Sequence, residues 1–228
     1  MVCLKSIKNG ILLVVVLILT PYLSLFPLAL FVTYYRIKFD PFKLTGFLDL
    51  AFFIFGAMFM FFLGFLTVPP ILFRIFRLRP KEGIYEPSFR EDNFVKWLLG
   101  GILYQLSYNI SKVLSFAVIT YVVKAFGGKI GKNSWIIGEV TEPYLFIMGE
   151  NSYIGGHATI NNHLYENGKL ILSKVVIGNN CLVGERAIIF PGVILKDNTT
   201  IGALSLVPKN KVLDGGLWVG IPARKIRD

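Results

Sequence analysis

The chain has 228 residues, enough for one or two domains, and its mean hydropathy of +0.61 excludes an ordinary, wholly soluble protein. The net charge of +10 suits either nucleic acid or an anionic lipid surface. The densest basic cluster, Arg74 to Lys81, borders an apolar segment, and no basic stripe with interleaved aromatic residues follows. Membrane lipid is therefore the expected partner, and no nucleic acid is expected.

Two uncharged segments near the N-terminus, residues 9–35 and 50–73, each exceed the roughly 20 residues that cross a bilayer core. We expect a transmembrane hairpin over residues 1–79, with spans at about 10–35 and 48–73 and a kink at the prolines of the first. A cleaved signal peptide is disfavoured because the first apolar run is too long. The flanking lysines and arginines favour an integral membrane protein with both termini and the C-terminal domain in the cytoplasm.

Residues 80–127 combine a polar linker with a second apolar region. That region, from Asn93 to Phe126, is interrupted by Lys96, Lys112 and Lys124. We expect one or two amphipathic helices that lie in the membrane interface. A third span over about 97–123 is the alternative, but it would place Lys112 in hydrocarbon at a cost of about 2–4 kcal/mol.

An aliphatic residue recurs every sixth position from residue 177 onward, a period that fits neither a helix nor a single strand. It fits a parallel β-solenoid in which three short strands complete a coil of about 18 residues. Small residues stand four positions after each aliphatic residue, and Asn179, Asn180 and Asn198 fall where the chain must turn. The inward aliphatic residues are Ile177, Val183, Ile189, Leu195, Ile201 and Val207, and the small residues are Cys181, Ala187, Val193, Thr199 and Ser205.

The same spacing occurs upstream at Ile130, Ile136, Met148, Ile154 and Ile160, and fails only at Glu142. We expect a solenoid of about four coils over residues 128–212, followed by a closing segment at 213–228. The register slips by one residue between Ile160 and Ile177. This slip predicts a loop at about 165–174 that leaves the solenoid, and such excursions often carry function.

These repeats, with the run Ile201 to Val207 and the ending Gly220 to Ile226, resemble the hexapeptide-repeat acyltransferase family. The resemblance covers about residues 128–228 and implies a left-handed parallel β-helix, a homotrimer and an acyl-coenzyme A co-substrate. A weaker similarity, from Asn93 onward and including residues 162–166, is to the C-terminal repeat module of poly-lysine synthetases and related amino-acid polymerases. Taken together, the fold expected is a left-handed parallel β-helix preceded by two transmembrane helices and one or two interfacial helices.

Acyl transfer needs a group that accepts a proton from the attacking hydroxyl or amine, and histidine suits this role near neutral pH. The chain has two histidines, His157 and His163, on consecutive hexads at adjacent corners of the coil. His163 opens the excursion and is followed by Glu166, which we expect to orient its imidazole. We predict His163 as the general base, with His157 as the alternative. A structural role as a corner residue stays open for each.

The resemblance also implies a binding site for acetyl-coenzyme A. Its pantetheine arm would contact Gly202, Ala203 and Ser205, with Gly184 a further candidate, while Pro222 and Ala223 would face the adenine. The phosphates would be met by Lys209, Arg224 and Lys225. Leu204 departs from the small residue usual in that run. Related zinc enzymes need three histidines per site, and this chain supplies two, so no metal is expected unless another ligand substitutes.

The function predicted is a membrane-anchored acyltransferase that moves an acetyl or other short acyl group to a hydroxyl or amine. A lipid-linked sugar or a lipid headgroup is the expected acceptor, because a soluble acceptor would gain nothing from two spans. One alternative is a non-catalytic trimeric scaffold for a partner enzyme at the membrane. Another is a transfer module whose thioester arrives on a carrier protein's phosphopantetheine.

Overall fold

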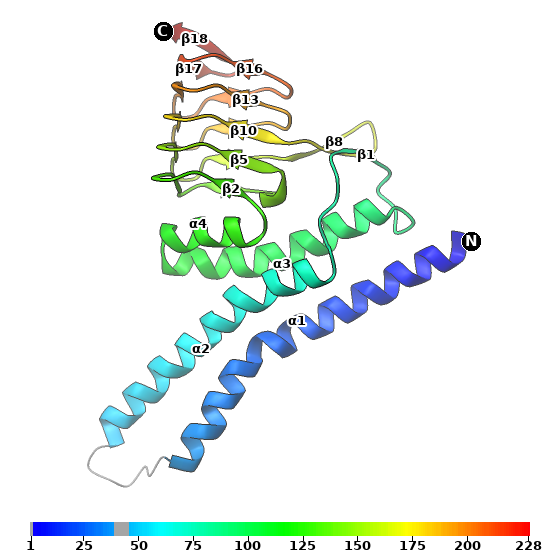
Figure 1. Cartoon of the computed structure of the whole chain (residues 1–228), viewed down its shortest axis with the longest axis vertical. Helices are drawn as coiled ribbons and strands as arrows, with labels where there is room; N and C mark the ends of the chain where they lie inside the picture. The colour runs from blue at the N-terminus through cyan, green and yellow to red at the C-terminus, as the bar shows by residue number, and fades with distance from the viewer. Residues whose placement is uncertain (1, 39–45) are drawn as a thin grey trace.

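The computed structural model describes residues 2–38 and 46–228, with side chains over 7–35 and 49–228. A β-helix stands on a pair of helices, and two longer helices extend away from that pair (Figure 1). The predicted fold class, a parallel β-helix preceded by two long apolar helices, is confirmed.

The two long helices are α1, Val2–Lys38, and α2, Gly46–Ile75. They contain candidate membrane spans at Ile7–Tyr35 and Asp49–Ile75, with mean hydropathies of 2.5 and 2.3. Their side chains are mostly exposed, unlike those of a core helix in a soluble protein. Pro21 and Pro27 lie inside α1, which changes direction part-way along (Figure 1).

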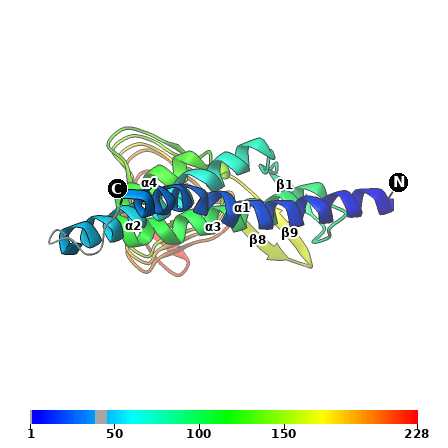
Figure 2. The same ribbon diagram turned by 90° about the horizontal axis from the view of Figure 1, so that it is seen from below.

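A close approach joins α1 to α2. A Cβ atom on Gly64 would lie 1.8 Å from the backbone oxygen of Ser24, so only glycine permits this packing. Small residues at a helix crossing are typical of helices that pack in lipid. In the view from below, α1 runs lengthwise under the rest of the molecule (Figure 2).

The β-helix rests on a platform made of α3, Asp92–Leu114, and α4, Phe116–Ala125. Glu91 caps the first helix and Ser115 the second, each accepting a backbone N–H. Several hydrogen bonds join the platform to the first coil, two of them to its backbone. The Tyr108 hydroxyl donates to the Gly138 carbonyl at 3.2 Å, and the Ile136 N–H donates to Thr120 Oγ1 at 3.2 Å. The helices thus cover the strand edges at that end of the β-helix.

Three parallel sheets form the faces of the β-helix. Face 1 contains β2 Lys129–Ile130, β5 Phe146–Met148, β10 Val175–Ile177, β13 Ile194–Leu195 and β16 Val212–Leu213. Face 2 contains β3 Trp135–Ile136, β6 Tyr153–Ile154, β11 Leu182–Val183, β14 Thr199–Ile201 and β17 Gly216–Gly220. Face 3 contains β4 Glu139–Val140, β7 Thr159–Ile160, β12 Ile188–Ile189 and β15 Leu206–Val207.

The predicted hexads form the interior of this β-helix. All six aliphatic residues from Ile177 to Val207 are at most 2% exposed, and the small residues between them are buried as well. Asn180 and Asn198 have φ of 54° and 61° and occupy stacked corners, as predicted. The coil count is larger than expected. Five strands stack on faces 1 and 2 and four on face 3, which gives about five coils instead of four.

The predicted excursion is a β-hairpin. Its strands are β8, His163–Glu166, and β9, Lys169–Leu172, and β1, Gly83–Tyr85, pairs with β9 as the third strand. The hairpin projects to one side of the β-helix (Figures 1 and 2). At the far end of the chain, β18, Ala223–Arg227, folds back on β17.

Two glycines test how tightly the first two coils stack. A Cβ on Gly138 would lie 2.3 Å from the Ala158 backbone oxygen, whereas a Cβ on Gly156 would meet only Ile137 at 3.8 Å. We expect Gly138→Ala to destabilise the protein by about 1–3 kcal/mol through overpacking, and Gly156→Ala to have little effect. Thermal unfolding of the purified chain measures both variants. Equal melting temperatures would contradict the close stacking at Gly138.

Candidate active site

The two histidines lie at opposite ends of β7 on face 3. His157 is the corner residue before this strand, exposed, with φ of 57°. His163 follows the strand at the next corner and begins the projecting hairpin. They are six positions apart in the sequence, so their Cα atoms are at most about 20 Å apart. The prediction that they occupy adjacent corners is confirmed.

His163 is paired with a carboxylate. Its Nδ1 lies 2.8 Å from Oε1 of Glu142, whose side chain is 7% exposed. By hydrogen-bond angle Nδ1 has no well-aligned partner among the described residues, so the contact with Glu142 is a close charge pairing. With a proton on Nδ1, facing this carboxylate, Nε2 would be the nitrogen that accepts a proton.

The carboxylate of Glu142 is itself held by two further groups. Trp97 Nε1 donates to Oε1 at 2.9 Å, and the Thr141 hydroxyl donates to Oε2 in a short hydrogen bond. The indole of Trp97 also meets the imidazole edge to face, with ring centroids 5.3 Å apart. Because a buried carboxylate is costly without partners, these contacts fix Glu142 in one position. The α3 helix and two coils of the β-helix thus meet at one charged group.

Two opposing effects act on the pKa of His163. Burial lowers it, but the hydrogen bond and the negative charge of Glu142 raise it by more. The net result is a pKa above the usual value for histidine. The same carboxylate that raises this pKa stabilises the protonated ring, as a residue that takes and returns a proton requires.

His163 and Glu142 line a pocket of about 470 Å³, which we call the α3 pocket. The walls come mainly from one side of α3, where Leu98, Ile102 and Leu106 supply apolar surface. Gly101 also lines the pocket, and a Cβ there would meet nothing within 4 Å. Gln105, Asn109 and Thr141 add polar groups. The pocket therefore combines a mostly apolar wall with an ionisable pair, as ligand sites commonly do.

His157 has different surroundings. It lines a separate pocket of about 490 Å³ with Lys112, Glu139 and Phe116, among others. Its side chain forms no hydrogen bond or ion pair with the described residues, so nothing orients its ring within one chain. Lys112 lies over the Tyr108 ring, 4.3 Å from its centroid.

The expectation that Glu166 orients His163 is wrong. Glu166 forms an ion pair with Lys209 instead, linking the hairpin to a later coil. Glu142 takes the expected role, and sequence reasoning missed it although a signal was present. It is the one position where the upstream hexads fail, because a carboxylate stands where an inward aliphatic residue belongs.

The residues expected to bind coenzyme A lie in three places. Gly184, Gly202 and Ala203 stack at the corner between faces 2 and 3, above His157 and away from His163. Ser205 is buried, and its Oγ accepts the Gly220 N–H at 3.0 Å, so it ties down the C-terminal hairpin.

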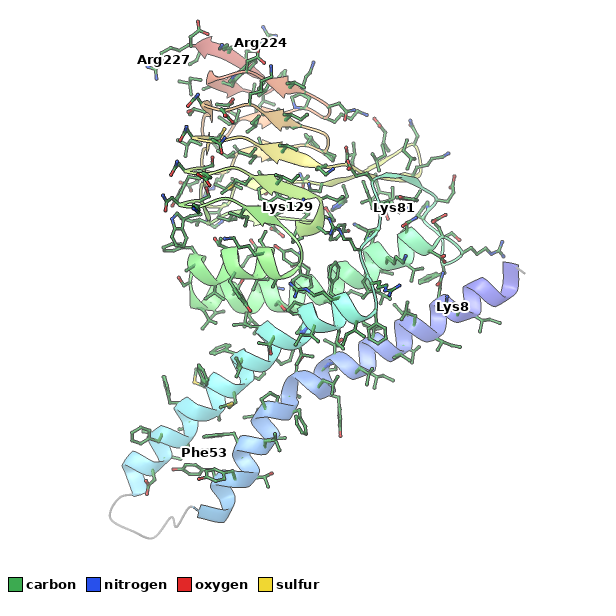
Figure 3. The ribbon with its side chains drawn as sticks, viewed as in Figure 1. Lys8, Phe53, Lys81, Lys129, Arg224 and Arg227 are labelled. Atoms are coloured by element: carbon green, nitrogen blue, oxygen red, sulfur yellow. The ribbon has the colours of Figure 1, made fainter. Side chains whose placement is uncertain are left out.

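The other candidates lie elsewhere. Lys209 is engaged by Glu166 at the corner that carries His163. Pro222, Ala223, Arg224 and Lys225 belong to the C-terminal hairpin, at the end of the β-helix farthest from the long helices, as the Arg224 label shows (Figure 3). One chain therefore does not bring these residues to His163. Among the described residues, no group of three or more histidine, cysteine, aspartate or glutamate side chains could hold a metal ion.

Comparison with known proteins bears on this site. Residues 174–203 match the family model described as the hexapeptide repeat of succinyl-transferase. The matched residues form part of the stacked coils described above. The chain therefore contains hexapeptide repeats in these coils.

The chain is similar to two curated proteins of different kinds. It is 30% identical to the delta-poly-L-ornithine synthetase of Acinetobacter baumannii over 56% of this chain and 10% of that protein. It is 32% identical to the galactoside O-acetyltransferase of Escherichia coli over 43% of this chain and 53% of that protein. The chain thus spans about half or less of the length of these relatives. Both resemblances predicted from the sequence are confirmed.

Among solved structures, a hexapeptide-repeat-containing acetyltransferase of Vibrio cholerae complexed with acetyl coenzyme A matches with a TM-score of 0.47. The identity is 17%, and the match covers 59% of this chain and 88% of that one.

The raised pKa of His163 predicts a specific titration. Glu142→Gln removes the charge that raises this pKa, so the midpoint should move to lower pH. With two histidines in the chain, histidine-selective isotope labelling gives two NMR signals, and His157→Asn assigns them. Because the folded pKa exceeds the unfolded one, the pair stabilises the fold below about pH 6.5, and this stabilisation is lost as the pH rises through the folded value. An unchanged midpoint in Glu142→Gln would show that Glu142 does not act on His163.

Proposed function

We propose that the protein is a membrane-anchored acyltransferase that moves an acetyl or other short acyl group from acyl-coenzyme A to a lipid-borne acceptor. The observation that carries this proposal is the Glu142–His163 pair in the wall of the α3 pocket. The acceptor group is a hydroxyl or amine on a lipid-linked sugar or a lipid headgroup. His163 is the general base, and Glu142 is its positioning residue.

The chemistry follows from the orientation of the imidazole. As the acceptor oxygen or nitrogen attacks the thioester carbonyl, Nε2 of His163 takes its proton. The carbon–sulfur bond of the tetrahedral intermediate then breaks, and the thiolate leaves with a proton returned from the imidazolium. Glu142 stabilises the imidazolium formed in between, because its carboxylate lies 2.8 Å from Nδ1.

The lining of the α3 pocket supports a lipid acceptor. Leu98, Ile102 and Leu106 offer apolar surface next to His163, on a helix that packs directly against α2. A polyprenyl or acyl chain lying there would bring its polar head to the imidazole. A small soluble acceptor would leave this apolar surface exposed to water, which is unfavourable.

The donor site of this proposal needs a second copy of the chain. Gly184 and Gly202 stand at the opposite end of face 3 from His163. In a homotrimer with neighbouring β-helices side by side, the stacked glycines Gly184 and Gly202 of one subunit would face His163 of the next. We call these stacked residues the Gly202 column. The C-terminal hairpin, with Arg224 and Lys225, would then meet the phosphates of acetyl-coenzyme A. We place both termini and the β-helix in the cytoplasm, where coenzyme A is found.

A second candidate function is favoured by the similarity to the poly-ornithine synthetase, which extends over 56% of this chain. In that alternative the acyl donor arrives as a thioester on a carrier protein. The same base and the same pocket would serve, and only the carrier of the thioester would differ.

The test compares the two histidines in matched variants. The full chain in lipid nanodiscs is given labelled acetyl-coenzyme A and a lipid extract, and release of coenzyme A is followed. We expect His163→Asn to lower the rate at least about 100-fold, as loss of a general base does. His157→Asn should change it little, because Asn tolerates the positive φ at this corner.

Other outcomes would contradict the assignment. A large loss in His157→Asn alone would make His157 the base. Turnover by the wild type of a carrier-bound thioester, with none of free acetyl-coenzyme A, would favour the second candidate. Failure of the wild type to bind coenzyme A or either thioester would favour a non-catalytic scaffold.

A further inference from the structure

Three arginines gather around a cavity of about 320 Å³ where α2 and α4 both end. Arg74, Arg77 and Arg79 are exposed, and within the described part of the chain none of them forms an ion pair. The other lining residues are uncharged: Phe73, Ala125, Phe126 and Gly127. We call this cavity the arginine pocket. Three uncompensated cations around one hollow indicate an anionic ligand.

The ends of the two helices do not explain the arginines. The last carbonyl groups of α2 accept the backbone N–H groups of Phe76, Arg77 and Leu78. Those of α4 accept the N–H groups of the residues from Phe126 to Gly128. Both helix ends are therefore satisfied largely by the main chain.

Two of the guanidinium groups are held in place by a backbone oxygen. Arg74 Nη2 donates to the Ala125 carbonyl at 3.0 Å, and Arg79 Nη2 donates to the Tyr144 carbonyl at 3.1 Å. Each guanidinium has five N–H donors, so most of the donors stay available. Arg77 has no side-chain hydrogen bond to the described residues. The carbonyl contacts thus orient the cations without neutralising them.

The position of the arginine pocket identifies the source of the anion. The candidate span Asp49–Ile75 ends at the pocket, which places it at the boundary between hydrocarbon and water. The rings of Phe73 and Phe126, with centroids 5.1 Å apart, form an apolar wall. Lys81 and Lys129 each follow a lining residue of the pocket by two positions in the chain, and both lie above the end of α2 in Figure 3. Cations beside an apolar wall at this level suit a phosphate that carries acyl chains.

We propose that the arginine pocket binds the phosphate group of an anionic membrane phospholipid. The guanidinium groups would donate to the phosphate oxygens, and the first methylene groups of the lipid would rest on the two rings. This site would fix the height of the β-helix above the bilayer. The proposal is independent of acyl transfer, because none of the residues of the arginine pocket lines the α3 pocket.

The experiment uses the full chain in detergent and counts bound lipid by native mass spectrometry. Phosphatidylglycerol is the probe, and diacylglycerol with the same chains is the comparison without phosphate. We expect phosphatidylglycerol to be retained and diacylglycerol to be lost. Arg77→Gln should weaken retention by about fivefold, and the triple variant of Arg74, Arg77 and Arg79 to Gln should weaken it much further.

A matched control removes three positive charges from the coils instead, with Lys132, Arg186 and Lys211 changed to Gln, and should retain phosphatidylglycerol like the wild type. The double variant Arg74→Lys with Arg79→Lys keeps the positive charge at both positions. If this variant retains phosphatidylglycerol and the Gln triple variant loses it, the loss comes from the removed charge and not from misfolding. Equal retention by the wild type and the Gln triple variant would overturn the proposal. So would equal retention of diacylglycerol, or displacement of the lipid by millimolar inorganic phosphate.

Discussion

The arrangement of this protein depends on one buried carboxylate. Glu142 occupies an inward position of the β-helix where the repeat calls for an aliphatic residue, so its charge must be met inside the fold. The groups that meet it come from α3, from the same corner and from the next coil: Trp97, Thr141 and His163. This requirement fixes the platform against the coils, and it places an oriented imidazole beside the surface of α3.

The same platform connects the coils to the two long apolar helices. The α3 and α4 helices cover the strand edges of the first coil on one side and pack against α2 on the other. The coils stack away from the two long helices, so each coil has a defined height above them (Figure 1). His163 lies on the second coil, close to the platform, and the Gly202 column lies higher. In the proposed function the lipid-borne acceptor therefore enters near the membrane and the soluble donor enters farther from it.

Much of the fold was predictable because the interior of a β-helix repeats. The six-residue spacing gave the inward residues, the small positions and the corners at Asn180 and Asn198. The slip after Ile160 predicted where the chain leaves the β-helix. It did not predict that this segment forms a hairpin paired with β1, because that pairing joins segments about 90 residues apart. The partner of His163 was mispredicted for the same reason. Proximity in sequence favoured Glu166, while stacking brings Glu142, 21 residues earlier, to the ring.

The most direct test of the central claim uses Gly101, whose missing side chain keeps the α3 pocket open beside His163. Membranes of cells that make the protein receive labelled acetyl-coenzyme A, and label is measured in the organic and aqueous phases after extraction. We predict that label enters lipid, that Gly101→Phe slows this several-fold by filling the pocket, and that Gly101→Ala does not. Label confined to water-soluble products and unaffected by Gly101→Phe would contradict an acceptor held in this pocket.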